Sequence, residues 1–201
     1  MDIKLYYTPR TRATRVRWLL EELQVPYQLI PVDLFGGEGY TKSYRAIHPL
    51  GYVPALSADG KIMHETGAIC AWLTEQFPDR QLAPPQNSEL WCEYQQWMYF
   101  VPGTLEPPIF YYLLHTNRLP ENQRVSQIPP WCLERYQHVL KMLERELKRK
   151  DYMVGEQFTT ADIMIGSILA MSGDLVRRYQ SLTRYTDNLM QRPAFKTAYS
   201  D

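Results

Sequence analysis

The sequence predicts an α+β protein of two domains, a mixed four-stranded sheet with helices followed by an all-helical domain. Two observations predict this class. Up to about residue 78 the pattern alternates in the order β-α-β-α-β-β-α, and no convincing strand follows. A stretch with two prolines, Leu82-Ala83-Pro84-Pro85-Gln86-Asn87, then changes the composition. The expected domains are 1–80 and 88–201, joined by a linker at 81–87.

The first half is justified element by element from local patterns. Apolar residues at helical spacing predict a helix that starts at Thr11 and ends before Pro26. A strand-helix-strand unit requires a parallel pair, and a hairpin at Asp59-Gly60 adds antiparallel partners. The expected strands are 3–7, 27–32, the stretch interrupted by Pro54, and 61–64; the further helices are 41–47 and 66–77.

The second half carries helical patterns only. The expected helices are 88–102, 105–116, 131–150, 160–176, 178–191 and 193–199. Thr159 and Asp162 form a capping box, in which each side chain serves a backbone donor of the same helix start, and Phe158 with Ile163 is placed as a hydrophobic staple. The polar groups of this box are therefore interpreted as structural.

Composition narrows the function classes. The 201 residues include 22 basic and 22 acidic ones, a balance that predicts neither a nucleic-acid nor a membrane partner. No apolar run approaches the length of a membrane span, and the chain enters a strand at once, so a cytoplasmic location is expected. Three widely spaced cysteines suit free thiols in a reducing compartment.

Charged side chains are interpreted mainly as solvated helix faces. Four arginines lie between residues 10 and 17, and Arg17 is expected to pair with Glu21 at i,i+4. The run 144–150 is expected to be an exposed helix end, with the pairs Glu144–Lys148 and Glu146–Lys150. His48, His64, His115 and His138 show no metal-ligand spacing, so no metal site is assigned.

The most informative stretch surrounds Pro54. A proline in a strand removes a ladder donor and leaves nearby backbone groups free, and the Val53-Pro54 bond is a candidate cis peptide. Shortly afterwards a helix opens at Glu65-Thr66 without a reciprocal cap, so its backbone donors stay available for an anion. This combination predicts a site for a small peptide-like ligand that carries a carboxylate.

These motifs in this order resemble the cytosolic glutathione transferase family over essentially the whole chain. The resemblance implies a thioredoxin-like N-terminal domain, and the stretch 99–108 is similar to bacterial and fungal members with a serine-like first turn. The matching elements are Leu5-Tyr6-Tyr7-x-Pro9, Arg15-Val16-x-Trp18-Leu19-Leu20-Glu21-Glu22-Leu23, Pro49-x-Gly51-x-Val53-Pro54, Glu65-Thr66-x-Ala68-Ile69, the box at Thr159, and Arg192-Pro193-Ala194.

The resemblance implies a glutathione site on the first domain. It places the backbone of Val53, before a cis Pro54, against the cysteinyl part of glutathione. Glu65 and Thr66 would hold the γ-glutamyl ammonium and carboxylate. The family's frequent Lys or Gln after the Pro-x-Gly turn is Tyr52 here. The glycine carboxylate is therefore left to His48, with Lys42 and Arg45 as alternatives.

The resemblance places the catalytic group just after the first strand, where Thr11 takes the position of the serine. Its hydroxyl would donate to the glutathione sulfur, with Arg12 favouring the thiolate by its charge. Thr11 would equally make a good helix cap, and Tyr6, Tyr7 or a bound water remain alternative donors. The cysteine of another class would fall at Arg12, which excludes a mixed disulfide there.

The implied activity is conjugation of glutathione thiolate to small hydrophobic electrophiles, a detoxification or stress function. Glutathione is then a cosubstrate, and no cofactor is required. Met98, Val101 and Tyr111 are the expected acceptor pocket in the helical domain, and a homodimer is expected. Two rivals are a non-catalytic binding or regulatory protein of this fold and a glutathione-dependent thiol oxidoreductase.

Overall fold

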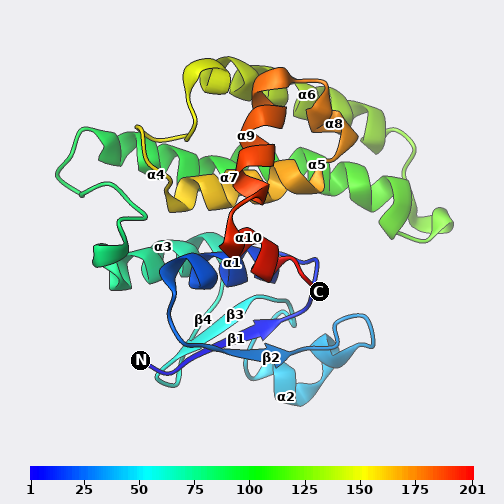
Figure 1. Cartoon of the computed structure of the whole chain (residues 1–201). Coiled ribbons are helices and arrows are strands. Elements are labelled where there is room, and N and C mark those ends of the chain that lie inside the picture. Colours follow the sequence, from blue (N-terminus) through cyan, green and yellow to red (C-terminus); the bar gives the residue numbers. More distant parts are fainter. The chain divides into compact units, whose positions relative to one another are not determined.

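A computed structural model describes all residues, 1–201, and they form two compact units (Figure 1). One unit contains Met1–Ala83 together with Gln191–Asp201, and the other contains Pro84–Met190. The boundary between the units, at Ala83 and Pro84, falls inside the stretch expected as the linker. The predicted range 88–201 differs from this division, because the segment Gln191–Asp201 packs with the first unit.

The sheet of the first unit is mixed and four-stranded, as predicted. Its strands β1 (Ile3–Tyr7), β2 (Gln28–Pro31), β3 (Ala55–Ala58) and β4 (Lys61–Met63) lie in the order β2-β1-β3-β4. The β1–β2 pair is parallel, and the β1–β3 and β3–β4 pairs are antiparallel. The expected hairpin joins β3 to β4, with positive φ at Asp59 and Gly60.

Helices cover both faces of this sheet. Figure 1 shows α1 (Ala13–Leu23), α3 (Thr66–Gln76) and α10 (Pro193–Ala198) on one side and the short α2 (Lys42–Arg45) on the other. The strand-and-helix order therefore confirms the α+β prediction. Single-turn 3-10 helices occupy Glu38–Tyr40 and Pro78–Arg80. The core side chains of α1 are almost fully buried, because this helix contacts β1, α3 and α10.

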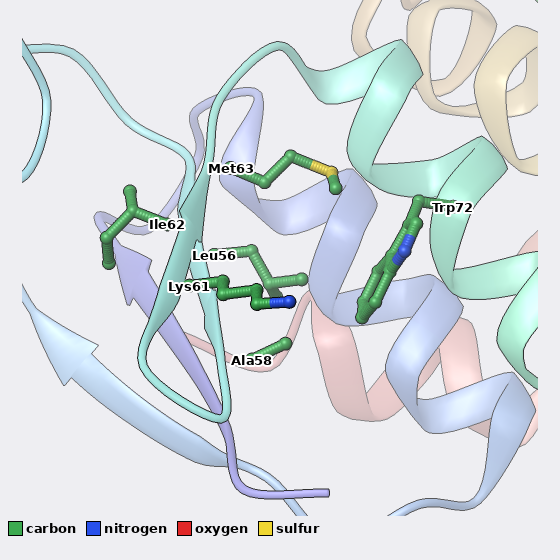
Figure 2. A pocket seen from close by; sticks show the side chains of 6 residues that line it. All are labelled: Leu56, Ala58, Lys61, Ile62, Met63 and Trp72. Carbon is green, nitrogen blue, oxygen red and sulfur yellow. The ribbon is translucent and has the colours of Figure 1, made fainter.

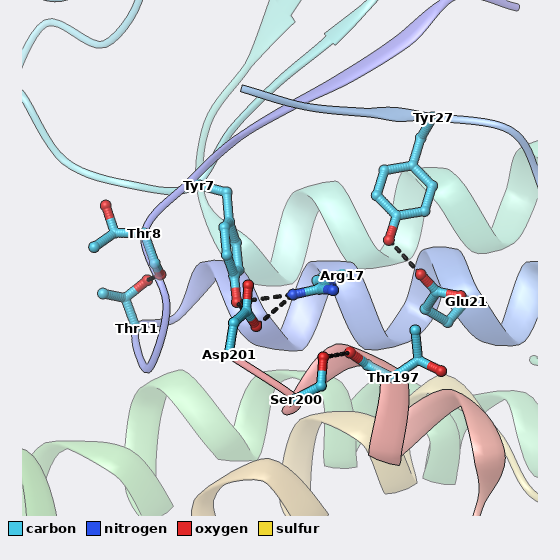
Figure 3. Close-up of polar contacts among 9 residues, drawn as sticks. All are labelled: Tyr7, Thr8, Thr11, Arg17, Glu21, Tyr27, Thr197, Ser200 and Asp201. Carbon is cyan, nitrogen blue, oxygen red and sulfur yellow. Dashed lines mark hydrogen bonds and ion pairs between the residues drawn. The ribbon is translucent and has the colours of Figure 1, made fainter. Parts of the chain in front are cut away.

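The predicted solvated arginine face on α1 is wrong. Arg15 and Arg17 are only 4% and 9% exposed. Arg17 does not pair with Glu21; it donates to Tyr7 and to Asp201, while Glu21 accepts from the Tyr27 hydroxyl (Figure 3). A helix face that the sequence pattern marks as polar is thus covered by other parts of the same unit.

The segment Gln191–Asp201 binds α1 through specific contacts. Arg192 forms a bidentate ion pair with Glu22, at 2.6 Å from Nε to Oε1 and 2.8 Å from Nη2 to Oε2. The same carboxylate accepts from the Trp18 indole at 2.9 Å. Phe195 packs edge-on against the Trp18 ring, with the centroids 4.9 Å apart. These contacts are the physical reason why this segment belongs to the first unit.

The second unit consists of helices. A long helical run holds α4 (Leu90–Phe100), a π-helical turn at Val101–Leu105, α5 (Glu106–Leu113) and a second π-helical turn at Leu114–Arg118. The prolines near the first π turn lack donors, which disturbs the regular ladder there. The remaining helices are 3-10 Glu121–Gln123, α6 (Ile128–Glu146), 3-10 Leu147–Arg149, α7 (Thr160–Met171), α8 (Asp174–Arg177) and α9 (Gln180–Met190).

Two buried or half-buried carboxylates hold this helical unit together. The predicted capping box is confirmed, and Asp162 accepts in addition from the Met153 amide and the Tyr185 hydroxyl. The predicted Glu144–Lys148 pair is replaced: Glu144 instead accepts from the Ser181 amide and hydroxyl at the start of α9. The Glu146–Lys150 pair forms as expected, at 2.5 Å.

None of the helices is both long and apolar enough to span a bilayer.

Candidate functional site

The turn before β3 contains Val53 and Pro54. The Val53-Pro54 bond is cis, as anticipated, and both residues are buried. Gly51 has φ +71°, and a Cβ there would lie 2.1 Å from the Gly39 carbonyl oxygen, so no other residue fits this approach. The Tyr44 hydroxyl donates to the Tyr52 carbonyl at 2.7 Å and fixes the turn from α2.

Glu65 and Thr66 form the start of α3 after β4. No side chain caps this helix, as the sequence predicts, so its first backbone donors can serve an anion. Glu65 is exposed and has φ +66°, a conformation that non-glycine residues rarely adopt, while Thr66 is buried. Backbone strain of this kind occurs at functional sites, and in this chain Arg10, Gln24, Asp59 and Gln81 have positive φ as well.

In the first turn, between β1 and α1, the hydroxyls of Thr8 and Thr11 both bond to backbone groups (Figure 3 draws both residues). The Thr8 hydroxyl donates to the Val32 carbonyl at 2.6 Å. The Thr11 hydroxyl donates to the Thr8 carbonyl at 2.7 Å and accepts from the Ala13 amide at 3.2 Å. Arg12 occupies the N-cap position and is exposed. In this geometry the single Thr11 proton is directed at the protein backbone.

The two tyrosines of β1 differ in their surroundings. Tyr7 is buried, and its hydroxyl donates to Asp201 at 3.0 Å, so its proton is already in use. Tyr6 lies opposite Ala55 of β3, and its ring meets the Tyr44 ring of α2 edge-on at 6.1 Å. Tyr6 therefore faces α2, whereas Tyr7 is directed toward α1.

His48 lies beside His64 and Glu65, which connect β4 to α3. Its ring is 4.4 Å from the His64 ring and 5.8 Å from the Tyr52 ring, measured between centroids. The ring is buried, and Nδ1 has no hydrogen-bond partner. Burial and then His64 lower the pKa of His48, while the Glu65 carboxylate opposes this effect. The other two candidates for a carboxylate, Lys42 and Arg45, are exposed on α2.

The three expected acceptor-pocket residues lie in different environments of the helical unit. Val101 is completely buried in the π-helical turn, and Met98 is buried on α4. Tyr111 is 49% exposed on α5. Only Tyr111 therefore presents a large part of its side chain at the surface of this structure.

One small cavity of the first unit lies away from these residues. It measures about 100 Å³ and opens between the edge strand β4 and α3. Figure 2 shows Met63 and Trp72 directed toward it, and Leu56, Ala58, Lys61 and Ile62 complete its lining. None of the predicted site residues lines it, and its volume is below that of ordinary ligand sites. No group of three or more His, Cys, Asp or Glu side chains could hold a metal ion.

The fold and this site define a protein with a thioredoxin-like domain that presents a cis-proline turn and an uncapped helix start, followed by a helical domain. Residues 5–81 match the family described as "Glutathione S-transferase, N-terminal domain", and residues 109–193 match "Glutathione S-transferase, C-terminal domain". This chain therefore belongs to the glutathione S-transferase family.

Individual proteins are similar over nearly the whole chain. Glutathione S-transferase 3 of Schizosaccharomyces pombe is 30% identical, over 98% of this chain and 86% of that protein. The Disulfide-bond oxidoreductase YfcG of Escherichia coli is 27% identical, over 96% of this chain and 92% of that protein. The glutathione transferase URE2P8 of Phanerochaete chrysosporium, solved with oxidized glutathione, has the same fold, with a TM-score of 0.89, 20% identity, and coverage of 99% and 94% of the two chains.

Proposed function

We propose that this protein binds glutathione and conjugates its thiolate to small hydrophobic electrophiles. The observation that carries the proposal is the pairing of the cis Val53-Pro54 turn with the strained, uncapped start of α3 at Glu65-Thr66. The backbone beside the cis bond would receive the peptide part of glutathione, and a helix start suits its γ-glutamyl carboxylate. The exposed Glu65 carboxylate would then receive the ammonium group.

The chemical requirement is a lower pKa of the glutathione thiol. A free thiol has a pKa of about 8.5, and lowering it by about two units takes roughly 2.7 kcal/mol of thiolate stabilisation. The start of α1, the Arg12 charge and a hydroxyl donor supply contributions of about 1 kcal/mol each. For Thr11 to be that donor, its proton must turn from the Thr8 carbonyl to the sulfur.

A second candidate function is glutathione binding without conjugation. The hydrogen bond from Thr11 to Thr8 favours it, because a hydroxyl that stays with the backbone does not stabilise a thiolate. Disulfide reduction is a third activity to be measured, since one relative is named as a disulfide-bond oxidoreductase.

The deciding experiment combines three assays on the purified protein. Glutathione binding is measured by calorimetry, conjugation with a generic aryl halide, and reduction with bis(2-hydroxyethyl) disulfide. Binding with conjugation supports the proposal. Binding alone would favour the second candidate, binding with disulfide reduction would favour the oxidoreductase, and absence of binding would exclude all three.

The proposal includes a homodimer in a reducing, cytoplasmic environment. Closed two-fold pairing is the commonest arrangement of soluble oligomers, and Phe35, Tyr40, Leu50 and Tyr52 leave large apolar surfaces exposed on the first unit. Cys70, Cys92 and Cys132 are free thiols, which suits a reducing compartment. Light scattering at micromolar concentration tests the dimer, and a species of 23.7 kDa would contradict it.

A further inference from the structure

We propose that Asp201 is a positioning residue for the first turn, Thr8–Arg12, acting through Tyr7 and Arg17. The inference rests on the proposed function, because the turn carries the expected thiol donor. Asp201 is far from this turn in sequence, and no motif of the chain points to it.

The geometry joins the two ends of the turn at one carboxylate (Figure 3). Asp201 Oδ1 accepts from the Tyr7 hydroxyl at 3.0 Å and from Arg17 Nη1 at 2.5 Å. Tyr7 is the last residue of β1, directly before the turn, and Arg17 lies on α1, one helical turn after its start. A single side chain therefore ties the strand end to the helix start.

The Arg17 guanidinium needs this carboxylate. Its side chain is only 11% exposed, and the ion pair with Asp201 is the only one that Arg17 forms. Arg17 also lies over the Tyr7 ring, 5.4 Å from the centroid, and donates to the Tyr7 hydroxyl at 3.3 Å. A nearly buried cation that loses its carboxylate must move toward solvent or another acceptor. The nearest helical alternative is Glu21 at i,i+4, and a shift to it would withdraw Arg17 from Tyr7.

A displacement of Tyr7 would be transmitted to Thr11 through Thr8. Tyr7 is bonded covalently to Thr8, and the Thr8 carbonyl is the acceptor that holds the Thr11 hydroxyl. Two hydrogen bonds to Val32, one from the Thr8 hydroxyl and one accepted by the Tyr7 carbonyl, hold the beginning of the turn next to the sheet. Asp201 and Arg17 therefore act mainly on the part of the turn that leads into α1. We therefore expect loss of Asp201 to loosen the turn without unfolding β1.

The test compares Asp201→Ala and Asp201→Asn with the control Ser200→Ala. Ser200 is a matched neighbour, because its hydroxyl only donates to the Thr197 carbonyl of the same segment. Three quantities are measured: hydrogen exchange of residues 8–15, the pH at which conjugation reaches half its maximal rate, and the melting temperature. Asn keeps an acceptor for Tyr7 but removes the charge, which also provides a second variant if Asp201→Ala folds poorly.

Asp201→Ala should speed exchange in residues 8–15 about tenfold or more, the scale of losing one charge-assisted bond. It should also raise the pH midpoint of conjugation by about half a unit, which is about threefold in thiolate stabilisation. Asp201→Asn should lie between, and Ser200→Ala should match the wild type.

Two results would overturn the inference. One is wild-type exchange in the first turn of Asp201→Ala. The other is faster exchange with an unmoved pH midpoint, which would make Asp201 a purely structural contact. If the wild-type protein binds glutathione but does not conjugate it, the proposed function fails. In that case glutathione affinity replaces the pH midpoint as the second readout. The exchange data and the affinities of the Asp201 variants then decide the role of Asp201.

Discussion

The Thr11 hydroxyl donates its proton to the Thr8 carbonyl oxygen, 2.7 Å away. This relationship makes the role of Thr11 a question of where one proton is directed. If it remains on the backbone, Thr11 contributes only to the stability of the turn. If glutathione binding redirects it to the sulfur, Thr11 lowers the pKa of the thiol.

The first prediction is that Thr11→Ala raises the pH at which conjugation reaches half its maximal rate and lowers turnover at neutral pH. Thr11→Ser should retain activity, because only the hydroxyl is needed. Arg12→Ala should raise the same midpoint through loss of a positive charge. The measurements are pH-rate curves and melting temperatures of the three variants. An unmoved curve in Thr11→Ala, with a stability loss of about 1 kcal/mol, would assign Thr11 to the turn alone.

The second prediction concerns Glu65, which combines a positive φ with an exposed carboxylate. Glu65→Ala should weaken glutathione binding by about 1.5–3 kcal/mol, the scale of a hydrogen bond to a charged group. Glu65→Gly should lose the same affinity, yet it should be about 1 kcal/mol more stable than Glu65→Ala because glycine tolerates this backbone conformation. Calorimetry and thermal unfolding measure the two effects. Wild-type affinity in either variant would remove Glu65 from the site.

The sequence predicts those features that local patterns determine. Period-two and helical spacing locate the strands and helices, and the capping box is complete within Thr159–Asp162. The cis bond at Val53-Pro54 and the uncapped start of α3 are likewise properties of a few neighbouring residues.

The features that the sequence does not reveal depend on distant partners. Arg17 has a suitable partner at Glu21, four residues on, yet it binds Asp201, 184 residues away. Glu144 could pair with Lys148, yet it binds the start of α9, 37 residues away. In both cases a partly buried tertiary contact replaces an exposed helical pair, whose own stabilisation is only about 0.2–0.5 kcal/mol. Local spacing carries no information about such partners.

The third prediction concerns Asp162 in the helical unit. Burial raises the pKa of Asp162 to about 6, above the ordinary value of 3.8, although the Thr159 and Met153 amides oppose this shift. The folded protein then binds this proton more tightly than the unfolded chain. The stability contributed by Asp162 is therefore greatest at low pH and is lost as the pH rises through about 6.

Asp162→Asn should lower the free energy of unfolding by about 1–3 kcal/mol, because its amide would face backbone donors. The difference from the wild type should narrow as the pH rises from about 4 to about 7, following the titration of Asp162. Chemical unfolding at several pH values measures this difference. A difference that widens with pH would show that the donors around Asp162 outweigh its burial.

The last prediction concerns His48, whose pKa is lowered by burial and by the neighbouring His64. Because the folded protein holds His48 neutral, the unfolded chain binds the proton more tightly. The stability that His48 contributes is thus complete above its unfolded pKa of about 6.5 and is lost as the pH falls through the lowered folded value. The groups that act on it are His64 and, in the opposite direction, Glu65.

His48→Gln should therefore lose less melting temperature than the wild type when the pH is lowered from about 7.5 to about 5. His138→Gln is the matched control for the same exchange at an exposed position, because His138 is exposed on α6. Glutathione affinity is measured on the same variants. If His48→Gln follows the wild-type curve, His48 does not titrate with folding; if it also keeps full affinity, the glycine carboxylate must be bound by Lys42 or Arg45.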